Sequence, residues 1–212
     1  KGCFVKLFSY VVEHDHGYAP NPENNICTLV HCKFKKRWQV RKNIVETAEK
    51  GDWILGTGAN STESCGNGKI IYLMRIDEKI SFTKYLKDSR FKKRIDCVDN
   101  GEGNTFALIS YTFYYFGSKA ITINSLPSGL RTVDVEKYRQ GYKYKDFSHS
   151  YIIKFVSYFA KKYKIGAHAM PCKPIKTSGI NIINTKKANC RAMSFTRKIY
   201  KATYCCKFGS AC

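Results

Sequence analysis

Short runs of β-branched and aromatic residues, separated by glycine, proline and asparagine, constrain the fold of this chain more than any other feature. Residues 3–12 alternate in the way that predicts a first strand. Residues 17–25 and 58–68 are rich in turn-forming residues and predict loops. Further strands are expected at Trp53–Leu55 and at 69–76, 105–116 and 120–123. Strands should therefore dominate an α+β fold.

Helical signals are fewer. Residues 42–50 have helical composition, and Ser81 is a plausible N-cap for a short helix over residues 81–86. The strongest pattern begins at Phe147, where apolar residues recur at helical spacing until Gly166 ends the helix. The run from Ile26 to Cys32 fits either a short strand or a buried helical turn. Residues 90–104 are expected to be a surface excursion.

The formal net charge is +21, from 37 basic and 16 acidic residues. No Asp or Glu follows Asp146, whereas Lys154 to Lys207 supply thirteen Lys and Arg. Such clustering favours polyanions as partners through counterion release, although a Lys-rich proteome gives basic proteins for other reasons. The 212 residues predict a domain at 1–166 and a basic extension at 167–212.

No apolar run approaches the roughly 20 residues of a spanning helix, and residues 1–12 do not resemble a signal peptide. We therefore expect a soluble, cytoplasmic protein without a membrane partner. The ten cysteines are scattered and contain no CxxC pair, so we expect them to be reduced. No metal or cofactor is expected.

Residues 14–59 are unusually dense in polar and turn residues, which is typical of loops that carry function. The order HDxGxAPNP, CTLxxCK, a basic segment and GDWIxGTG resembles the nucleotide-modification-associated domain family, type two. The resemblance continues through residues 70–91 and 113–123, and covers about residues 4–165. It implies a curled mixed β-sheet or small PUA-like β-barrel with peripheral helices, related to ASCH, EVE and YTH domains. It also implies a genomic association with enzymes that modify DNA bases. A scaffold subunit within a modification or phage-defence system is a further option.

The motifs suggest a base- or nucleotide-binding pocket between the HDHGYAPNP and GDWILGTG segments. An Asn amide suits a base edge and an indole can stack on a base, whereas a stiff turn and a core tryptophan are the structural alternatives. The candidate residues are Asp15, Tyr18, Asn21, Thr28, Trp53, Thr57 and Gly58.

The basic block that follows Cys32 suits phosphate contact, and a solvated charge run is the alternative. Its candidate phosphate-binding residues are Lys33, Lys35, Lys36, Arg37, Arg41 and Lys42. The expected partner is nucleic acid, DNA rather than RNA, or a nucleotide, together with DNA-modification enzymes.

The alternative function is an enzyme that acts on a nucleotide or modified base. Its candidate catalytic residues are His14, Asp15, Cys27 and His149. An Asp beside a His can raise imidazole basicity, and a Cys with a base can act as a nucleophile. Both require that these side chains converge in one pocket.

Overall fold

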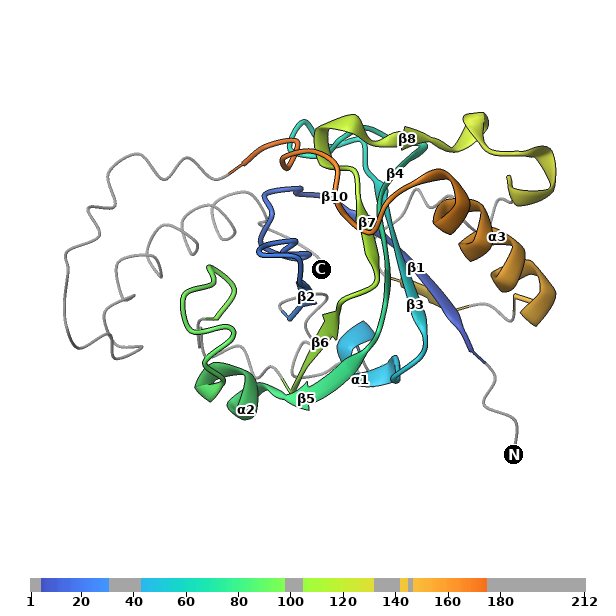
Figure 1. The fold of residues 1–212 in the computed structure, drawn as a ribbon. Coiled ribbons are helices and arrows are strands. Elements are labelled where there is room, and N and C mark those ends of the chain that lie inside the picture. The colour runs from blue at the N-terminus through green and yellow to red at the C-terminus, as the bar shows by residue number, and fades with distance from the viewer. Residues whose placement is uncertain (1–4, 31–42, 98–104, 132–141, 145–146, 175–212) are drawn as a thin grey trace.

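The computed structural model describes residues 5–30, 43–97, 105–131, 142–144 and 147–174. Its strands form a seven-stranded and a three-stranded sheet (Figure 1). The larger sheet has the order β10-β7-β4-β3-β1-β9, with β8 paired to β4. Its strands are β1 (Leu7–Val12), β3 (Trp53–Gly58), β4 (Lys69–Arg75), β7 (Phe113–Tyr115), β8 (Ile121–Thr122), β9 (Tyr142–Tyr144) and β10 (Gly166–Ala167). The β1–β3 and β10–β7 pairs are parallel, and the other pairs are antiparallel.

The smaller sheet has the order β2-β6-β5 and is antiparallel. It contains β2 (Cys27–Leu29), β5 (Glu78–Ser81) and β6 (Phe106–Ser110). The helices are α1 (Ile44–Thr47), α2 (Phe82–Lys87) and α3 (His149–Lys162), and the short 3-10 helices are η1 (Gly117–Lys119), η2 (Ile123–Ser125) and η3 (Ser128–Leu130). The expected α+β class with a curled mixed sheet is confirmed. Within the described residues the strands form two sheets and do not close into a barrel.

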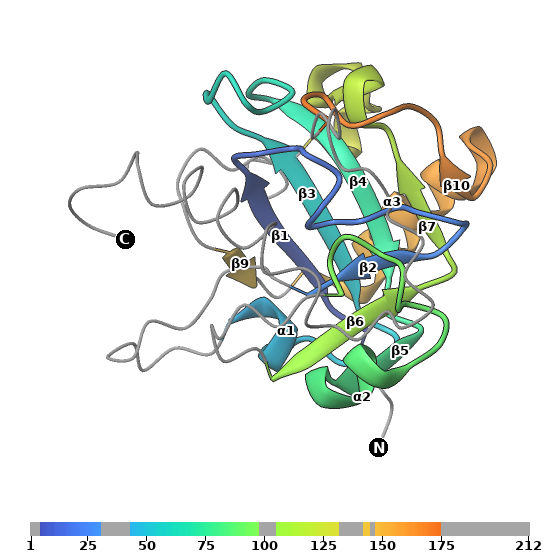
Figure 2. The ribbon, with the colours of Figure 1, turned by 90° about the vertical axis from the view of Figure 1, so that its left-hand side faces the viewer.

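Alternation along the central strands separates two apolar cores. In β1, Phe8, Tyr10 and Val12 pack toward the small sheet, while Leu7 packs on the α3 side. In β3, Ile54 faces the core beneath the small sheet, and Trp53 faces the core beneath α3. Because side chains of a strand alternate between faces, each central strand contributes to both cores. The small sheet and α3 consequently cover opposite faces of the large sheet (Figures 1 and 2).

Local capping explains where the helices begin. The side chain of Ser81 accepts a hydrogen bond from the backbone N–H of Lys84, as the N-cap prediction requires. Asn43 and Glu46 form a capping box at α1. In α3, Ser148 caps the first turn, and Ile152, Phe155 and Phe159 lie on the buried face. This helix confirms the strongest periodic pattern of the sequence.

Two expectations about the chain outside these elements need correction. The segment that begins at residue 90 carries buried Phe91, Arg94 and Asp96, so the described part up to residue 97 is a packed segment and not a surface excursion. The sequence also predicts reduced cysteines, whereas Cys65 and Cys172 form a disulfide across 107 residues.

The α3 packing gives a direct stability prediction. Phe159 is fully buried among aromatic rings, so Phe159→Ala should lower the free energy of unfolding by about 3–5 kcal/mol through the cavity it leaves. Ile153→Ala on the same helix is the control, because its side chain is 51% exposed and should change stability little. Chemical denaturation of both variants measures the difference. Equal, small losses would contradict the assignment of Phe159 to the core.

Candidate functional site

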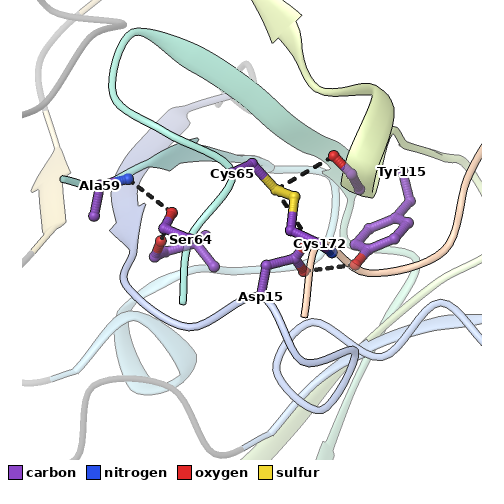
Figure 3. Close-up of a disulfide and its surroundings, with 8 residues drawn as sticks. Asp15, Ala59, Ser64, Cys65, Tyr115 and Cys172 are labelled. Carbon is purple, nitrogen blue, oxygen red and sulfur yellow. Dashed lines mark hydrogen bonds between the residues drawn. A yellow bond between two sulfur atoms is a disulfide. The ribbon is translucent and has the colours of Figure 1, made fainter. Parts of the chain in front are cut away.

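The carboxyl group of Asp15 is the centre of a polar cluster at the loop after β1 (Figure 3). Asp15 lies in the loop after β1 and is fully buried. Its Oδ1 accepts a hydrogen bond from the Tyr115 hydroxyl at 2.5 Å, and its Oδ2 accepts one from the Cys172 backbone N–H at 2.9 Å. The side chain therefore joins three segments that are distant in the sequence.

The backbone of Asp15 makes two further connections. Its N–H donates to the carbonyl of Glu63 at 3.0 Å, and its carbonyl accepts from the N–H of Lys173 at 3.0 Å. Beyond it, the imidazole of His16 lies 3.1 Å from a carboxylate oxygen of Glu63. His14 lies beside His16, with ring centroids 5.6 Å apart. The end of β1 thus collects two imidazoles and two carboxyl groups.

Burial governs the electrostatics of this cluster. Desolvation raises the pKa of Asp15 above its ordinary value of 3.8, against the lowering effects of the Tyr115 and Cys172 hydrogen bonds and of nearby His16. Burial and the adjacent Asp15 also raise the pKa of Tyr115, so the phenol remains a hydrogen-bond donor. The hydrogen bond from His16 lowers the pKa of Glu63.

The disulfide holds the C-terminal segment against this cluster. Cys65 Sγ lies 3.1 Å from Asp15 Oδ2 and 3.3 Å from the Gly117 carbonyl oxygen. A half-cystine has no thiol proton, so these contacts are close approaches and not hydrogen bonds in the oxidised protein. Residues 166–174, which we call the strap, also pair with β7 and accept a hydrogen bond from Ser118 N–H at the Met170 carbonyl.

The strap leaves no room for larger residues at two glycines. A Cβ at Gly17 would lie 2.6 Å from Pro171 Cγ, and one at Gly117 would lie 2.1 Å from the Met170 carbonyl oxygen. Both glycines have positive φ, at +76° and +49°. The strap therefore fits the loops before β2 and after β7 closely. The strap lies beyond the boundary that the sequence predicts at residue 166, and it contacts both of these loops.

A second buried network fixes the expected base-reading residues. The amide of Asn21 donates to Asp96 at 2.9 Å, and the hydroxyl of Thr28 also donates to that carboxylate. The guanidinium of Arg94 donates to the carbonyl of Asn21 and to the Thr28 hydroxyl. All four side chains are at most 3% exposed. Asn21 and Thr28 therefore hold the segment that runs from the end of β1 into β2, which we call the motif loop, to residues 91–97.

The remaining binding candidates lie in several places. Tyr18 is 8% exposed, and Thr57 is buried with its hydroxyl 3.3 Å from the Tyr10 carbonyl, to which it donates. A Cβ at Gly58 would lie 1.9 Å from the Gly66 carbonyl oxygen, so this glycine permits close packing of the 58–68 loop.

Trp53 packs in the core beneath α3, with 7% of its surface exposed. Trp53 starts β3 opposite Leu7, whereas Asp15 follows the far end of β1. The structure does not bring Trp53 and Asp15 together.

The catalytic candidates are also dispersed. Cys27 is buried in β2, its thiol lies 3.9 Å from Met74 Sδ, and burial raises the pKa of that thiol. Such a thiol is a poor nucleophile. His149 begins α3 and is exposed on the other side of the large sheet. Lys33, Lys35, Lys36, Arg37, Arg41 and Lys42 lie outside the described residues.

The comparison with protein families gives one result. Residues 4–106 match the family model described as nucleotide modification associated domain 2. The first half of this chain is therefore similar to that family. The match contains the strands from β1 to β5 and ends at the first residue of β6, so β7 and α3 complete the fold beyond it. The resemblance drawn from residues 113–123 lies beyond the matched range. No curated protein and no solved structure matches the chain significantly.

Five functional or supporting residues were missed by sequence reasoning: Cys65, Arg94, Asp96, Tyr115 and Cys172. Pairing of cysteines cannot be deduced from their spacing, and ten cysteines permit many connectivities. Arg94 and Asp96 lie in the polar string FKKRIDC, which gives no sign of burial. Their roles depend on tertiary contacts with the motif loop.

The raised pKa of Asp15 predicts an unusual pH dependence. A carboxyl whose folded pKa exceeds its unfolded value contributes most below the unfolded pKa, and this contribution falls as the pH rises through the folded pKa. The difference in unfolding free energy between wild type and Asp15→Asn should therefore shrink with rising pH. Denaturation from about pH 4 upward measures it. A difference that grows with pH would mean that the pKa is lowered instead.

Proposed function

We propose that this protein is a nucleic-acid-binding module, DNA rather than RNA being its main partner, that serves DNA base modification. The observation that carries the proposal is the outer face of α3. Lys154 and Lys161 are seven residues apart and therefore lie on the same side of the helix, and Lys164 follows the C-cap residue Tyr163. All three are exposed, and the described residues from 147 to 174 contain no Asp or Glu. We call these three residues the α3 lysine face.

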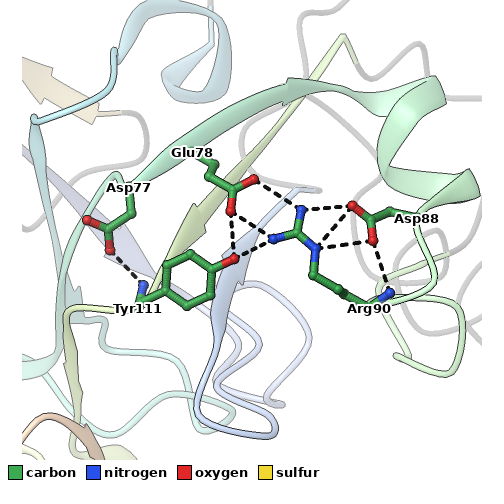
Figure 4. Close-up of polar contacts among 5 residues, drawn as sticks. All are labelled: Asp77, Glu78, Asp88, Arg90 and Tyr111. Atoms are coloured by element: carbon green, nitrogen blue, oxygen red, sulfur yellow. Dashed lines mark hydrogen bonds and ion pairs between the residues drawn. The ribbon is translucent and has the colours of Figure 1, made fainter.

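The carboxylates of the described part are largely engaged within the protein. Figure 4 shows Arg90 between Glu78 and Asp88, with Tyr111 donating to Glu78 at 2.6 Å. Hydrogen bonds from Arg90 lower the pKa of both carboxyl groups. Ion pairs also join Glu49 to Lys79 and Asp77 to Arg75. Because these acids are neutralised locally, the excess positive charge is displayed by lysines such as those of α3.

Dispersal of the catalytic candidates favours binding over catalysis. Asp15 holds three segments together, Cys27 is buried beside Met74, and His149 lies on the opposite side of the large sheet. Convergence of a nucleophile and a base is the minimum for the alternative enzyme. A binding module requires only an accessible basic surface, which α3 provides.

A shallow apolar groove runs beside the α3 lysine face. It is lined by Val5, Trp53, His149, Ile152, Ile153, Val156 and Ser157. Trp53 forms a buried wall, whereas His149 and Ile153 are exposed and next to Lys154. An unstacked base needs an aromatic or apolar surface near a cation that holds its phosphate. We propose that a base of single-stranded DNA contacts His149 here, in place of the pocket expected between the two motif segments.

The α3 lysine face gives the test of binding. The triple variant Lys154→Gln, Lys161→Gln, Lys164→Gln should weaken oligonucleotide binding. Its plot of log K against log salt should be shallower by about 0.9 for each duplex phosphate contact removed. Fluorescence anisotropy over a salt series with duplex and single-stranded DNA and with RNA measures this.

The matched control removes three other exposed charges with Lys84→Gln, Lys87→Gln and Lys92→Gln near α2. This control variant should lower oligonucleotide affinity less than the α3 triple variant does. The slope of its plot of log K against log salt should stay near that of wild type. Equal effects of the two triple variants would show that binding depends only on net charge, which would contradict a site on α3.

The groove gives a separate test. His149→Ala should reduce affinity for single-stranded DNA by about 1–3 kcal/mol, the usual value of one stacked base, and leave duplex affinity unchanged. The exposed position of His149 means that unfolding should be unaffected. If both nucleic acids bind His149→Ala as they bind wild type, no base occupies this groove.

A further inference from the structure

A buried carboxyl and two sulfur atoms meet at the strap. The ligand atoms of Asp15, Cys65 and Cys172 lie within 4.8 Å of one another. Asp15 is fully buried and both cysteines are half-buried. The three residues come from the loop after β1, the β3–β4 loop and the strap (Figure 3).

The charge balance of this cluster is unusual. None of the ion pairs among the described residues involves Asp15. Buried charges in proteins are normally paired or coordinate a metal. Two hydrogen bonds satisfy part of the carboxyl group, and among the described residues His16 acts on it by charge without forming an ion pair with it. A bound cation would supply that compensation.

We propose that the reduced protein binds Zn²⁺ through the thiolates of Cys65 and Cys172 and the carboxylate of Asp15, and that the disulfide is the metal-free, oxidised form of this site. Thiolate ligands select zinc over magnesium or calcium. Three protein ligands leave the fourth tetrahedral position open to water or to another ligand.

The geometry requires only a local adjustment. Tetrahedral Zn–S bonds of about 2.3 Å place two sulfurs about 3.8 Å apart, which a reduced pair attains by side-chain rotation. Cys65 Sγ already lies 3.1 Å from Asp15 Oδ2, a separation close to that of two ligands on one ion. The backbones of the two cysteines, 5.5 Å apart at Cα, need not move far. Metal and disulfide therefore hold the strap in the same place.

The conversion between the two forms is balanced by a thiol reductant. A dithiol gives two electrons to the Cys65–Cys172 bond and becomes a disulfide, while its two protons end on the two cysteine sulfurs. Zinc then displaces both thiol protons into solvent and binds the two thiolates. A disulfide oxidant reverses the sequence and releases the ion.

The test is a titration of the full chain with Co²⁺, the spectroscopic substitute for Zn²⁺, followed by Zn²⁺ competition. Wild type reduced with a phosphine should bind one more equivalent of Co²⁺ than reduced Cys172→Ser does. It should also show a stronger thiolate-to-cobalt charge-transfer band. Zn²⁺ should displace this equivalent. Oxidised wild type should lack it, which supplies a comparison without any substitution. Because other cysteines of the chain lie outside the described residues and can also bind Co²⁺, the decisive quantity is the difference in bound Co²⁺ between wild type and Cys172→Ser.

Two further variants define the ligand set. Cys27→Ser, which removes a buried cysteine outside the cluster, should bind as wild type does. Asp15→Asn should keep both thiolates but weaken binding by at least about tenfold, since even supporting residues of metal sites have effects of that size. Equal stoichiometry in reduced wild type, oxidised wild type and Cys172→Ser would overturn the proposal. Unchanged affinity in folded Asp15→Asn would remove Asp15 from it.

Discussion

The hydrogen bonds to the Asp15 carboxyl group are the interaction on which the arrangement of the loop after β1 depends. Tyr115 from β7 and the backbone of Cys172 from the strap both donate to this one group. Since a buried carboxyl is costly unless its oxygens are satisfied, loss of either donor affects the position of the other. The disulfide adds a covalent link at the same point. This coupling explains why a polar, loop-like stretch of sequence is so firmly held.

The motif loop is fixed at its other end by Arg94. Its guanidinium reaches the carbonyls of Asn21 and Glu23 and the hydroxyl of Thr28, and Asp96 accepts from both Asn21 and Thr28. Satisfied buried networks of this kind specify one loop conformation. Polar residues that suit a base edge by their chemistry are here committed to the fold. Density of polar and turn residues thus marks a well-ordered loop and does not by itself locate a ligand.

Much of the fold follows from local pattern. The strands, the Ser81 N-cap and the apolar face of α3 obey rules of alternation, capping and helical spacing, which neighbouring residues determine. The site does not follow in this way, because Cys65 and Cys172 pair across 107 residues and Arg94 is buried in a string of charges. Trp53 illustrates the same limit: its strand was predicted, but alternation alone does not say which core its indole enters. Long-range contacts decide that.

The central claim is that nucleic acid contacts the outer face of α3 and not the loop after β1 that contains the buried Asp15. Lysine acetylation footprinting, read by mass spectrometry with and without an oligonucleotide, tests it most directly. The expected result is that Lys154, Lys161 and Lys164 lose reactivity in the complex, while the exposed Lys84 and Lys87 of α2 keep theirs. Protection of the α2 lysines with undiminished reactivity along α3 would contradict it.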